Sequence, residues 1–395
     1  MTMNSEIEAV IQSLRSDADG KAALSACEKV EGWARATKTK ELVELAAALE
    51  ERCDPADQKT HASFEAVGDH VEDQLALVPG DAAVEAVFTL ALRDRVRSVL
   101  LKRPRELRAR ALASRLGFGQ TKETFLAALE RGEERPDLLE LLACWLQEVV
   151  LRGTALSKEA RATRFAERLA TAKHPLAELP LELCGTEREV PSYMPLYGDK
   201  GLGRAIETLA SGPMSARTVP PPADGATVRV TRLEDEALAQ RLETAVRPWS
   251  EGSKGKCEAK LFEISPPITS GLGSWFLRAL PLDSTKGTAR LDVTRAEDPA
   301  AVFGTLFSAA SNGGAYSAGL GGAYGRRAAW ASLGALVGAA PDATITQIDE
   351  LAVRSAFLTF RAPGPWFYDV AWDLGVLALR PDGATAAVLA ATDTE

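Results

Sequence analysis

The sequence predicts an α+β protein of two domains, an all-helical N-terminal domain and a C-terminal domain with a mainly antiparallel sheet. Three observations lead to this prediction. The chain has 395 residues, more than a single hydrophobic core usually serves. Helical periodicity dominates the first part, whereas runs of period two appear only in the second. All three histidines lie in the first 174 residues, and all five tyrosines lie from Tyr193 onward.

A proline-rich stretch between residues 174 and 195 is typical of an irregular connector. We therefore expect an all-helical domain over residues 1–178, a connector over 179–222 and a Gly/Ala-rich α+β domain over 223–395.

Apolar residues in the first domain recur at the spacing of one helix face. Ile7, Val10, Ile11 and Leu14 fall at i, i+3, i+4 and i+7. The same reasoning predicts about nine helices, the later ones at 62–78, 82–100, 104–116, 122–131, 137–151 and 158–172. Helices of similar length with short links are typical of a solenoid-like array or of an irregular bundle. No repeat of fixed period is present, and we favour the array.

The second domain carries β-rich runs at 227–231, 257–264, 289–294 and 355–360, followed by two longer runs. Arg380-Pro381-Asp382-Gly383 joins these last two and predicts a hairpin turn, because proline and glycine stand where a type I turn with a bulge needs them. Helices are expected at 233–246, at 298–310 and within 317–352. Because strands and helices do not alternate regularly, the pattern indicates an antiparallel sheet rather than a doubly wound nucleotide fold.

Composition restricts the functional class. The net charge of −9 disfavours attraction to nucleic acid or to an anionic membrane. No secretory leader is recognisable, and the longest apolar run, 328–340, is shorter than the roughly 18 residues that span a bilayer. These features predict a cytoplasmic protein without a membrane contact. The five cysteines are scattered and lack a C-x-x-C pair, so we expect reduced, mostly buried thiols and no metal or cofactor.

Residues 311–327 read SNGGAYSAGLGGAYGRR. The segment lacks the third glycine of a dinucleotide fingerprint and the Gly-Lys-Ser/Thr ending of a P-loop. If a helix begins near Ser317, small residues on one face would let another element approach closely. If it begins after Gly325, two arginines in its first turn would suit a phosphorylated small molecule or nucleotide. The ligand-binding candidates are Asn312, Gly313, Gly314, Tyr316, Gly321, Gly322, Tyr324, Arg326 and Arg327. We favour the structural interpretation.

Residues 93–115 hold nine basic and two acidic side chains. Such a concentration suits an acidic protein partner or nucleic acid, although no aromatic residue is present for base stacking. The competing interpretation is neutralisation by glutamates of neighbouring helices, such as Glu130, Glu133, Glu134 and Glu140, and we place it slightly ahead. The partner-binding candidates are Arg97, Lys102, Arg103, Arg105, Arg108, Arg110 and Arg115.

No catalytic constellation is recognisable. In a strand over WFYDVAWD, Asp369 and Asp373 would lie about 13 Å apart on a polar outer face, too far to share one ion. His61, His70 and His174 are expected to be surface or helix-capping groups, and no histidine follows them.

The sequence thus predicts an intracellular protein-interaction protein, an adaptor, regulator or assembly factor with a protein partner, and favours a function other than catalysis. The alternatives are an enzyme or sensor that uses residues 311–327, and a nucleic-acid or acidic-partner binder that uses residues 93–115. The oligomeric state is not determined by the sequence.

Overall fold

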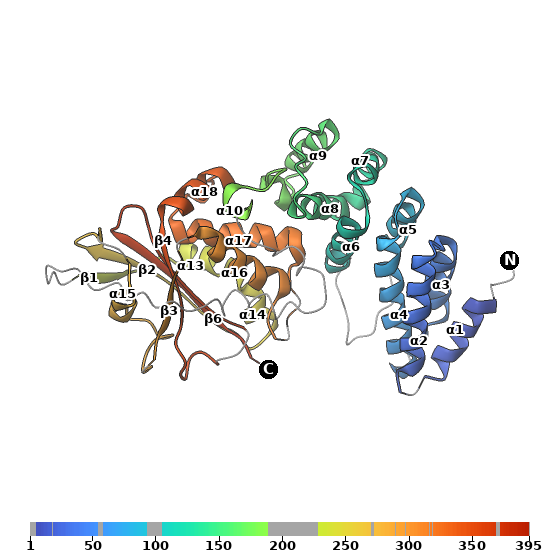
Figure 1. Cartoon of the computed structure of the whole chain (residues 1–395), viewed down its shortest axis with the longest axis horizontal. Helices are drawn as coiled ribbons and strands as arrows, with labels where there is room; N and C mark the ends of the chain where they lie inside the picture. Colours follow the sequence, from blue (N-terminus) through green and yellow to red (C-terminus); the bar gives the residue numbers. More distant parts are fainter. Residues whose placement is uncertain are drawn as a thin grey trace. The chain divides into compact units, whose positions relative to one another are not determined.

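The computed structural model describes residues 5–17, 19–53, 58–92, 105–188, 228–269, 272–288, 290–296, 298–315, 317, 319–368 and 372–394. The chain forms two compact units, Met1–Ala172 and Lys173–Glu395. The first is a helical array, and the second contains a six-stranded antiparallel sheet covered by helices (Figure 1). The predicted α+β class is confirmed.

The helices of the first unit follow the predicted order, and most of their ends lie within a few residues of the predicted ones. They are α1 Ser5–Arg15, α2 Lys21–Arg35, α3 Thr39–Arg52, α4 Gln58–Leu77, α5 Asp81–Ala91, α6 Arg105–Gly119, α7 Lys122–Arg131, the 3-10 turn η1 Pro136–Leu138, α8 Leu139–Leu151 and α9 Ala160–Thr171. The helix predicted over 82–100 ends at Ala91, and residues 93–104 lie outside the described part of the chain.

From α1 to α7, each helix of this unit packs against the helix two positions further along the chain. Contacts join α1 to α3, α3 to α5, α5 to α7 and α7 to α9, and they also join α2 to α4, α4 to α6 and α6 to α8. Odd-numbered and even-numbered helices therefore form two layers, which is the packing of a solenoid rather than of a closed bundle. The array interpretation of the sequence is supported.

The core of the array is centred on α8. Its residues are buried on every side of the helix from Leu141 to Leu151, and the Trp145 ring lies edge-on to Phe125 of α7, with centroids 5.1 Å apart, and to Phe88 of α5 at 6.4 Å. An apolar helix packed between neighbours on all sides produces this burial.

The sheet of the second unit has the strand order β1-β2-β6-β5-β4-β3, and all neighbouring strands are antiparallel. The strands are β1 Arg229–Leu233, β2 Lys256–Ser265, β3 Asp292–Ala296, β4 Ala356–Arg361, β5 Asp373–Leu379 and β6 Thr385–Thr392. The predicted hairpin between β5 and β6 is confirmed: Gly383 N donates to Arg380 O at 2.9 Å, and the positive φ of Gly383, +65°, explains the glycine at this position.

Both faces of the sheet are covered, which is why the central strands β5 and β6 are apolar apart from Asp373, Thr385 and Thr392 at their ends. One face packs against α13 Glu236–Leu242, α14 Arg247–Gly252, α16 Pro299–Asn312 and α17 Gly321–Val337, and the 3-10 turn η3 Glu243–Ala245 packs against these helices (Figure 1). On the other face, Phe276 and Leu277 of α15 Ser274–Ala279 join a core with Phe262 and Phe360.

Three short elements complete the second unit around α17. They are η2 Pro175–Glu178, α10 Gly185–Arg188 and α18 Ile345–Arg354. The 3-10 turn η2 and helix α18 contact α17, and α10 contacts α16. The segments η2 and α10, which precede the strands in the chain, therefore pack against α17 and α16.

Candidate functional site

The glycine-rich segment forms the connection between α16 and α17. Helix α17 begins at Gly321, so Arg326 lies in its second turn rather than in its first. A Cβ atom at Gly325 would lie 2.8 Å from Ser311 Cβ and 2.9 Å from Ser311 Cα, and one at Gly319 would overlap the Ser311 carbonyl. These glycines therefore let the backbones of α16 and α17 approach closely, as the structural interpretation expected.

Arg326 is fully buried in an ion pair with Glu187 of α10. Its Nε and Nη2 atoms donate to the two Glu187 oxygens at 2.6 and 2.8 Å, and the guanidinium also donates to the Pro180 and Glu182 carbonyls at 3.0 Å. Trp330 Nε1 donates to the same carboxylate at 3.0 Å. The guanidinium thus joins residues 180–187 to α17 and does not face solvent.

The charge state of Glu187 follows from these contacts. Burial raises the pKa of this carboxyl, but the charge and hydrogen bonds of Arg326 outweigh burial and leave the pKa below its ordinary value. The pair is therefore ionised at neutral pH, and each charge compensates the other in a site that water does not reach.

The loop before α17 does bind an anionic group, but that group is the chain's own Asp393. Ala315 N donates to Asp393 Oδ2 at 2.8 Å, and Ser253 Oγ donates to Asp393 Oδ1 at 2.8 Å. The Asp393 carboxylate is fully buried. The neighbouring amide of Gly314 donates to Ser317 Oγ at 2.8 Å. Within the segment proposed for ligand binding, the amide of Ala315 thus binds an internal carboxylate.

The other candidates from this segment lie at the two helix ends. Asn312 ends α16 and accepts a hydrogen bond from Ser311 Oγ at 3.2 Å, and Gly313 is the C-cap with φ +78°. Gly321, Gly322 and Tyr324 form the first turn of α17. Tyr316 lies outside the described residues.

Arg327, in contrast, lies at a surface hollow. The hollow has a volume of about 510 Å³ and is lined by Arg241, Arg247 and Arg327, together with Trp330, Thr344, Asp342 and other residues. We call it the arginine pocket. The Arg327 side chain is 39% exposed and pairs with Glu178 at 2.6 Å. The pocket was not predicted, because Arg241 and Arg247 lie far from Arg327 in the sequence.

The wall of the arginine pocket adds two further features. Arg241 donates to the Ala339 carbonyl at 3.2 Å, just after α17 ends. The N-terminus of α18 lies at the wall, where Thr344 and Gln347 form a capping box. The partial positive charge of a helix N-terminus adds to that of the guanidinium groups. Glu178 and Asp342 also line the hollow, so its three arginines exceed its carboxylates by one positive charge.

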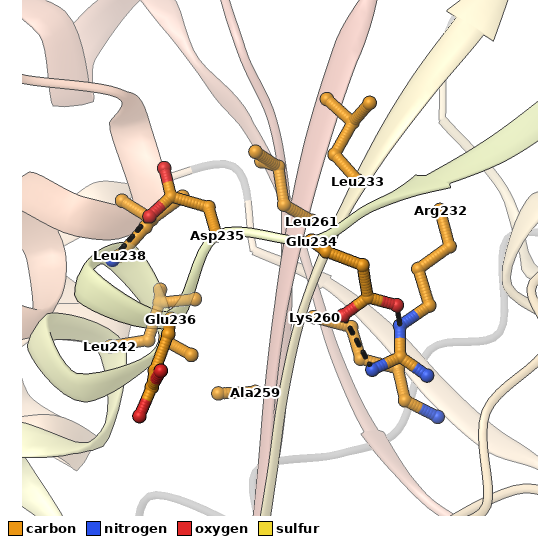
Figure 2. Close-up of a pocket in the computed structure, with 11 residues that line it drawn as sticks. Arg232, Leu233, Glu234, Asp235, Glu236, Leu238, Leu242, Ala259, Lys260 and Leu261 are labelled. Carbon is orange, nitrogen blue, oxygen red and sulfur yellow. Dashed lines mark hydrogen bonds and ion pairs between the residues drawn. The ribbon is translucent and has the colours of Figure 1, made fainter.

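A second hollow, of about 480 Å³, lies between β1, β2 and α13 (Figure 2). Its apolar lining includes Leu238, Leu242 and Leu261. Arg232 Nε pairs with Glu234 Oε1 at 3.0 Å, as the dashed lines of Figure 2 show, and Asp235 accepts from Leu238 N at 2.9 Å to cap α13. Arg232 and Glu234 at this hollow are thus engaged with each other, as Arg327 is with Glu178 at the arginine pocket.

The basic segment is largely neutralised where the structure describes it. Arg108 is buried and pairs with Glu72 of α4, and Arg110 lies 3.9 Å from Glu140. Arg115 lies 3.5 Å from Asp73. Among the glutamates that the sequence pointed to, Glu140 meets this segment, whereas Glu130 and Glu133 pair with Arg161 and Arg164. Arg97, Lys102, Arg103 and the side chain of Arg105 lie outside the described part.

An exposed aromatic residue near the end of α6 was not singled out from the sequence. The Phe118 side chain is 71% exposed, and the guanidinium carbon of Arg152 lies 5.2 Å from its ring centroid. A Cβ at Gly117 would lie 2.7 Å from Glu148 Cβ, and one at Gly119 would lie 2.5 Å from Leu77 Cα. The backbone on both sides of the ring is thus packed tightly. The signal in the sequence is the Gly-Phe-Gly triplet.

A cysteine, a histidine and a glutamate meet between α3 and α4. Cys53 Sγ lies 3.1 Å from His61 Nδ1, and His61 Nε2 lies 3.9 Å from Glu65 Oε2. His61 is 1% exposed, so the prediction of a surface or capping histidine is wrong for this residue. It is right for His174, whose Nδ1 accepts from Leu176 N. The expectation of mostly buried cysteines is also wrong, because four of the five are half-buried.

Of the segment 366–373, for which the sequence predicted a strand with a polar outer face, the structure describes residues 366–368, 372 and 373. Strand β5 begins only at Asp373, and this residue is buried, with its carboxylate accepting a hydrogen bond from Thr392 Oγ1. The partner strand supplies a hydroxyl, so the carboxylate tolerates burial. Asp369 lies outside the described residues.

Among the described residues, no group of three or more His, Cys, Asp or Glu is arranged to hold a metal ion, and no helix is both long and apolar enough to cross a membrane. Comparison with curated proteins and with solved structures finds no match. A family model described as a family of unknown function (DUF6183) matches residues 25–395, most of the chain, and the chain belongs to that family.

Proposed function

We propose that the chain is a protein-interaction protein whose helical unit binds a partner protein through Phe118. The observation that carries this proposal is the 71% exposure of the Phe118 ring beside a guanidinium. Single exposed apolar side chains are common on folded surfaces, but arginine and aromatic residues together dominate the energetics of protein interfaces.

The setting of Phe118 supports the same proposal. Tight packing at Gly117 and Gly119 restrains the backbone that presents the ring, and Arg152 donates to the Ser114 carbonyl at 3.2 Å while it faces the ring. A rigid aromatic group loses little conformational entropy when a partner covers it. The two-layered array adds an extended surface on either side. The partner we expect therefore has an apolar recess for the ring.

The test compares two exposed apolar residues of the same unit. Leu24 of α2 is 69% exposed and serves as the matched control for Phe118. Immobilised full-length protein is used to capture partners from lysate of the producing cells, and a captured protein is then purified for affinity measurement. We expect Phe118→Ala to raise the Kd about 30-fold, as at an interface hot spot, and Leu24→Ala to change it less than about 3-fold. Equal losses for both variants, or capture that Phe118→Ala leaves intact, would contradict the proposal.

A second function has support from the arginine pocket. We propose that this pocket binds a small phosphorylated anion. Three guanidinium groups, two carboxylates and a helix N-terminus line a volume of about 510 Å³, within the range of small-molecule sites. The candidate residues differ from those predicted. Arg327 is retained, and Arg241 and Arg247 are added. Arg326 is not a candidate for this pocket, because it is buried in its pair with Glu187.

Thermal unfolding of the full chain with inorganic phosphate, pyrophosphate, sugar phosphates and nucleotides tests the second function. A ligand present at 100 times its Kd stabilises the folded state by about 2.7 kcal/mol. We expect the double variant Arg247→Ala, Arg327→Ala to lose that stabilisation, while Arg354→Ala, an exposed arginine of α18 outside the pocket lining, retains it. A panel without any stabilising anion, or stabilisation that survives in the double variant, would refute this function.

A further inference from the structure

The contact between Cys53 and His61 has the geometry of an activated thiol. Cys53 directly follows the last residue of α3, and His61 lies in the first turn of α4. The distance of 3.1 Å between Sγ and Nδ1 is short enough for a hydrogen bond in which one proton is shared between the two atoms. A nucleophile within hydrogen-bonding distance of an imidazole base is the basic unit of thiol catalysis and of reactive-thiol sites.

Glu65 completes the arrangement on the other side of the imidazole. It lies one turn after His61 on α4, with its Oε2 atom 3.9 Å from His61 Nε2, and both side chains are almost completely buried. When His61 takes the thiol proton, the imidazolium charge lies beside this carboxylate. The neighbouring Arg52 pairs with Glu8 at 2.8 Å, so its charge is compensated outside the Cys53–His61 contact.

The other four cysteines of the chain provide an internal contrast. Burial raises the pKa of Cys144 and of Cys257 well above the ordinary value. Burial, with the nearby Glu187 carboxylate, raises the pKa of Cys184 to about 12. Burial and the Glu31 carboxylate raise the pKa of Cys27. These thiols therefore stay protonated at neutral pH, and protonated thiols are poor nucleophiles.

We propose that Cys53 is the nucleophilic thiol of this protein, a modification site for small uncharged electrophiles, with His61 as its base and Glu65 as the residue that positions and charge-balances His61. In the step with iodoacetamide, the thiol proton passes to His61 Nδ1, the sulfur electron pair forms the S–C bond, and the C–I bond breaks to release iodide. We expect only small electrophiles to react, because the Cys53 thiol is half-buried and the His61 imidazole beside it is buried.

The experiment measures alkylation of each cysteine in the folded full-length protein with limiting iodoacetamide at neutral pH, by peptide mass spectrometry. Cys27, also half-buried, is the matched reference thiol. We expect Cys53 to react at least about 10-fold faster than Cys27, because the thiolate is the reacting form. Cys53 reacting no faster than Cys27 would overturn the proposal.

Two variants separate activation from mere accessibility. His61→Asn removes the base, and we expect the Cys53 rate to fall about 10-fold or more while the Cys27 rate stays unchanged. Glu65→Gln keeps the side-chain shape, so it reports on the arrangement even if His61→Asn does not fold. We expect Glu65→Gln to lower both the Cys53 rate and the thiolate ultraviolet absorbance that is lost in Cys53→Ser. An unchanged Cys53 alkylation rate in folded His61→Asn would refute activation of the thiol by His61. An unchanged rate and an unchanged thiolate absorbance in folded Glu65→Gln would show that Glu65 does not position His61.

Discussion

Each unit of the protein contains a buried arginine–glutamate pair, and the two pairs join very different parts of the chain. In the helical unit, Arg108 of α6 pairs with Glu72 of α4, 36 positions away, and donates to the Leu90 carbonyl in the last turn of α5. In the sheet unit, Arg326 pairs with Glu187, 139 positions away. The first pair joins neighbours in a regular array, whereas the second holds a distant segment against α17.

The difference bears on how basic residues are interpreted from sequence. Both arginines belonged to sets that the sequence proposed as binding residues, and both are buried against an internal carboxylate. Arg327, next to Arg326 in the chain, is 39% exposed at a pocket. The number of basic residues in a sequence segment therefore overestimates the positive charge that is available to a ligand, because some of these residues pair with carboxylates inside the fold.

Loss of Arg326 is expected to have the largest effect on stability. Arg326→Met leaves the Glu187 charge buried without its counterion, which costs about 4–5 kcal/mol. Hydrogen exchange monitored by mass spectrometry, read at the α17 amides, measures this loss within the sheet unit. The double variant Arg326→Met, Glu187→Gln removes both charges and keeps an acceptor for Trp330, so it should recover at least about half of the loss. Failure to recover would mean that the arginine acts by packing rather than by charge.

Loss of Arg108 is expected to cost less, about 3 kcal/mol, because Arg108 and Glu72 are 7% and 3% exposed and water partly screens the charge that remains. Protection of the α4 and α6 amides is the measurement. The matched control is Arg115→Met in the same helix, since the Arg115 and Asp73 side chains are each about a third exposed, and such pairs contribute at most about 1 kcal/mol. Equal costs for Arg108→Met and Arg115→Met would show that burial does not distinguish the two pairs.

Acid is expected to weaken the sheet unit through Glu187. The pKa of this carboxyl is below its ordinary value of 4.5, so the folded state binds this proton less readily than the unfolded state. Its contribution to stability is complete above about pH 4.5 and is lost as the pH falls through the folded-state pKa. Urea unfolding between pH 7 and pH 3 should show a steeper loss for the natural protein than for Arg326→Met, Glu187→Gln. Parallel pH profiles would exclude Glu187 as the source.

Two glycine substitutions give the smallest expected effects, and the effects have opposite signs. Gly325→Ala introduces a methyl group 2.8 Å from Ser311 Cβ, and overpacking of this kind costs about 1–3 kcal/mol. Gly32→Ala in α2 places its methyl in open space, where better helix propensity stabilises by about 0.5–1 kcal/mol. Chemical unfolding of both variants is the measurement. Stabilisation by Gly325→Ala would contradict the close approach of α16 and α17.

Elements defined by local patterns were predicted well. Helix α7 has the predicted bounds 122–131, and the hairpin at Arg380–Gly383 forms the predicted turn. Helix α4, however, begins at Gln58 rather than at the predicted 62. That shift of one turn hid the i, i+4 relation of His61 and Glu65, and with it the arrangement around Cys53. Helix starts are difficult to locate from sequence because terminal residues contribute little to the apolar stripe.

The sequence by itself determined the periodicity of each segment, and hence the helices, the strands, the hairpin and the division into helical and sheet-containing parts, because these depend on neighbours within a few residues. Only the tertiary structure decided that Arg326 meets Glu187, that Asp393 accepts the amide of Ala315, and that Arg241, Arg247 and Arg327 share one pocket. The physical reason is that a charged side chain interacts with whatever group the fold brings within a few ångströms. That group can be more than a hundred residues away along the chain.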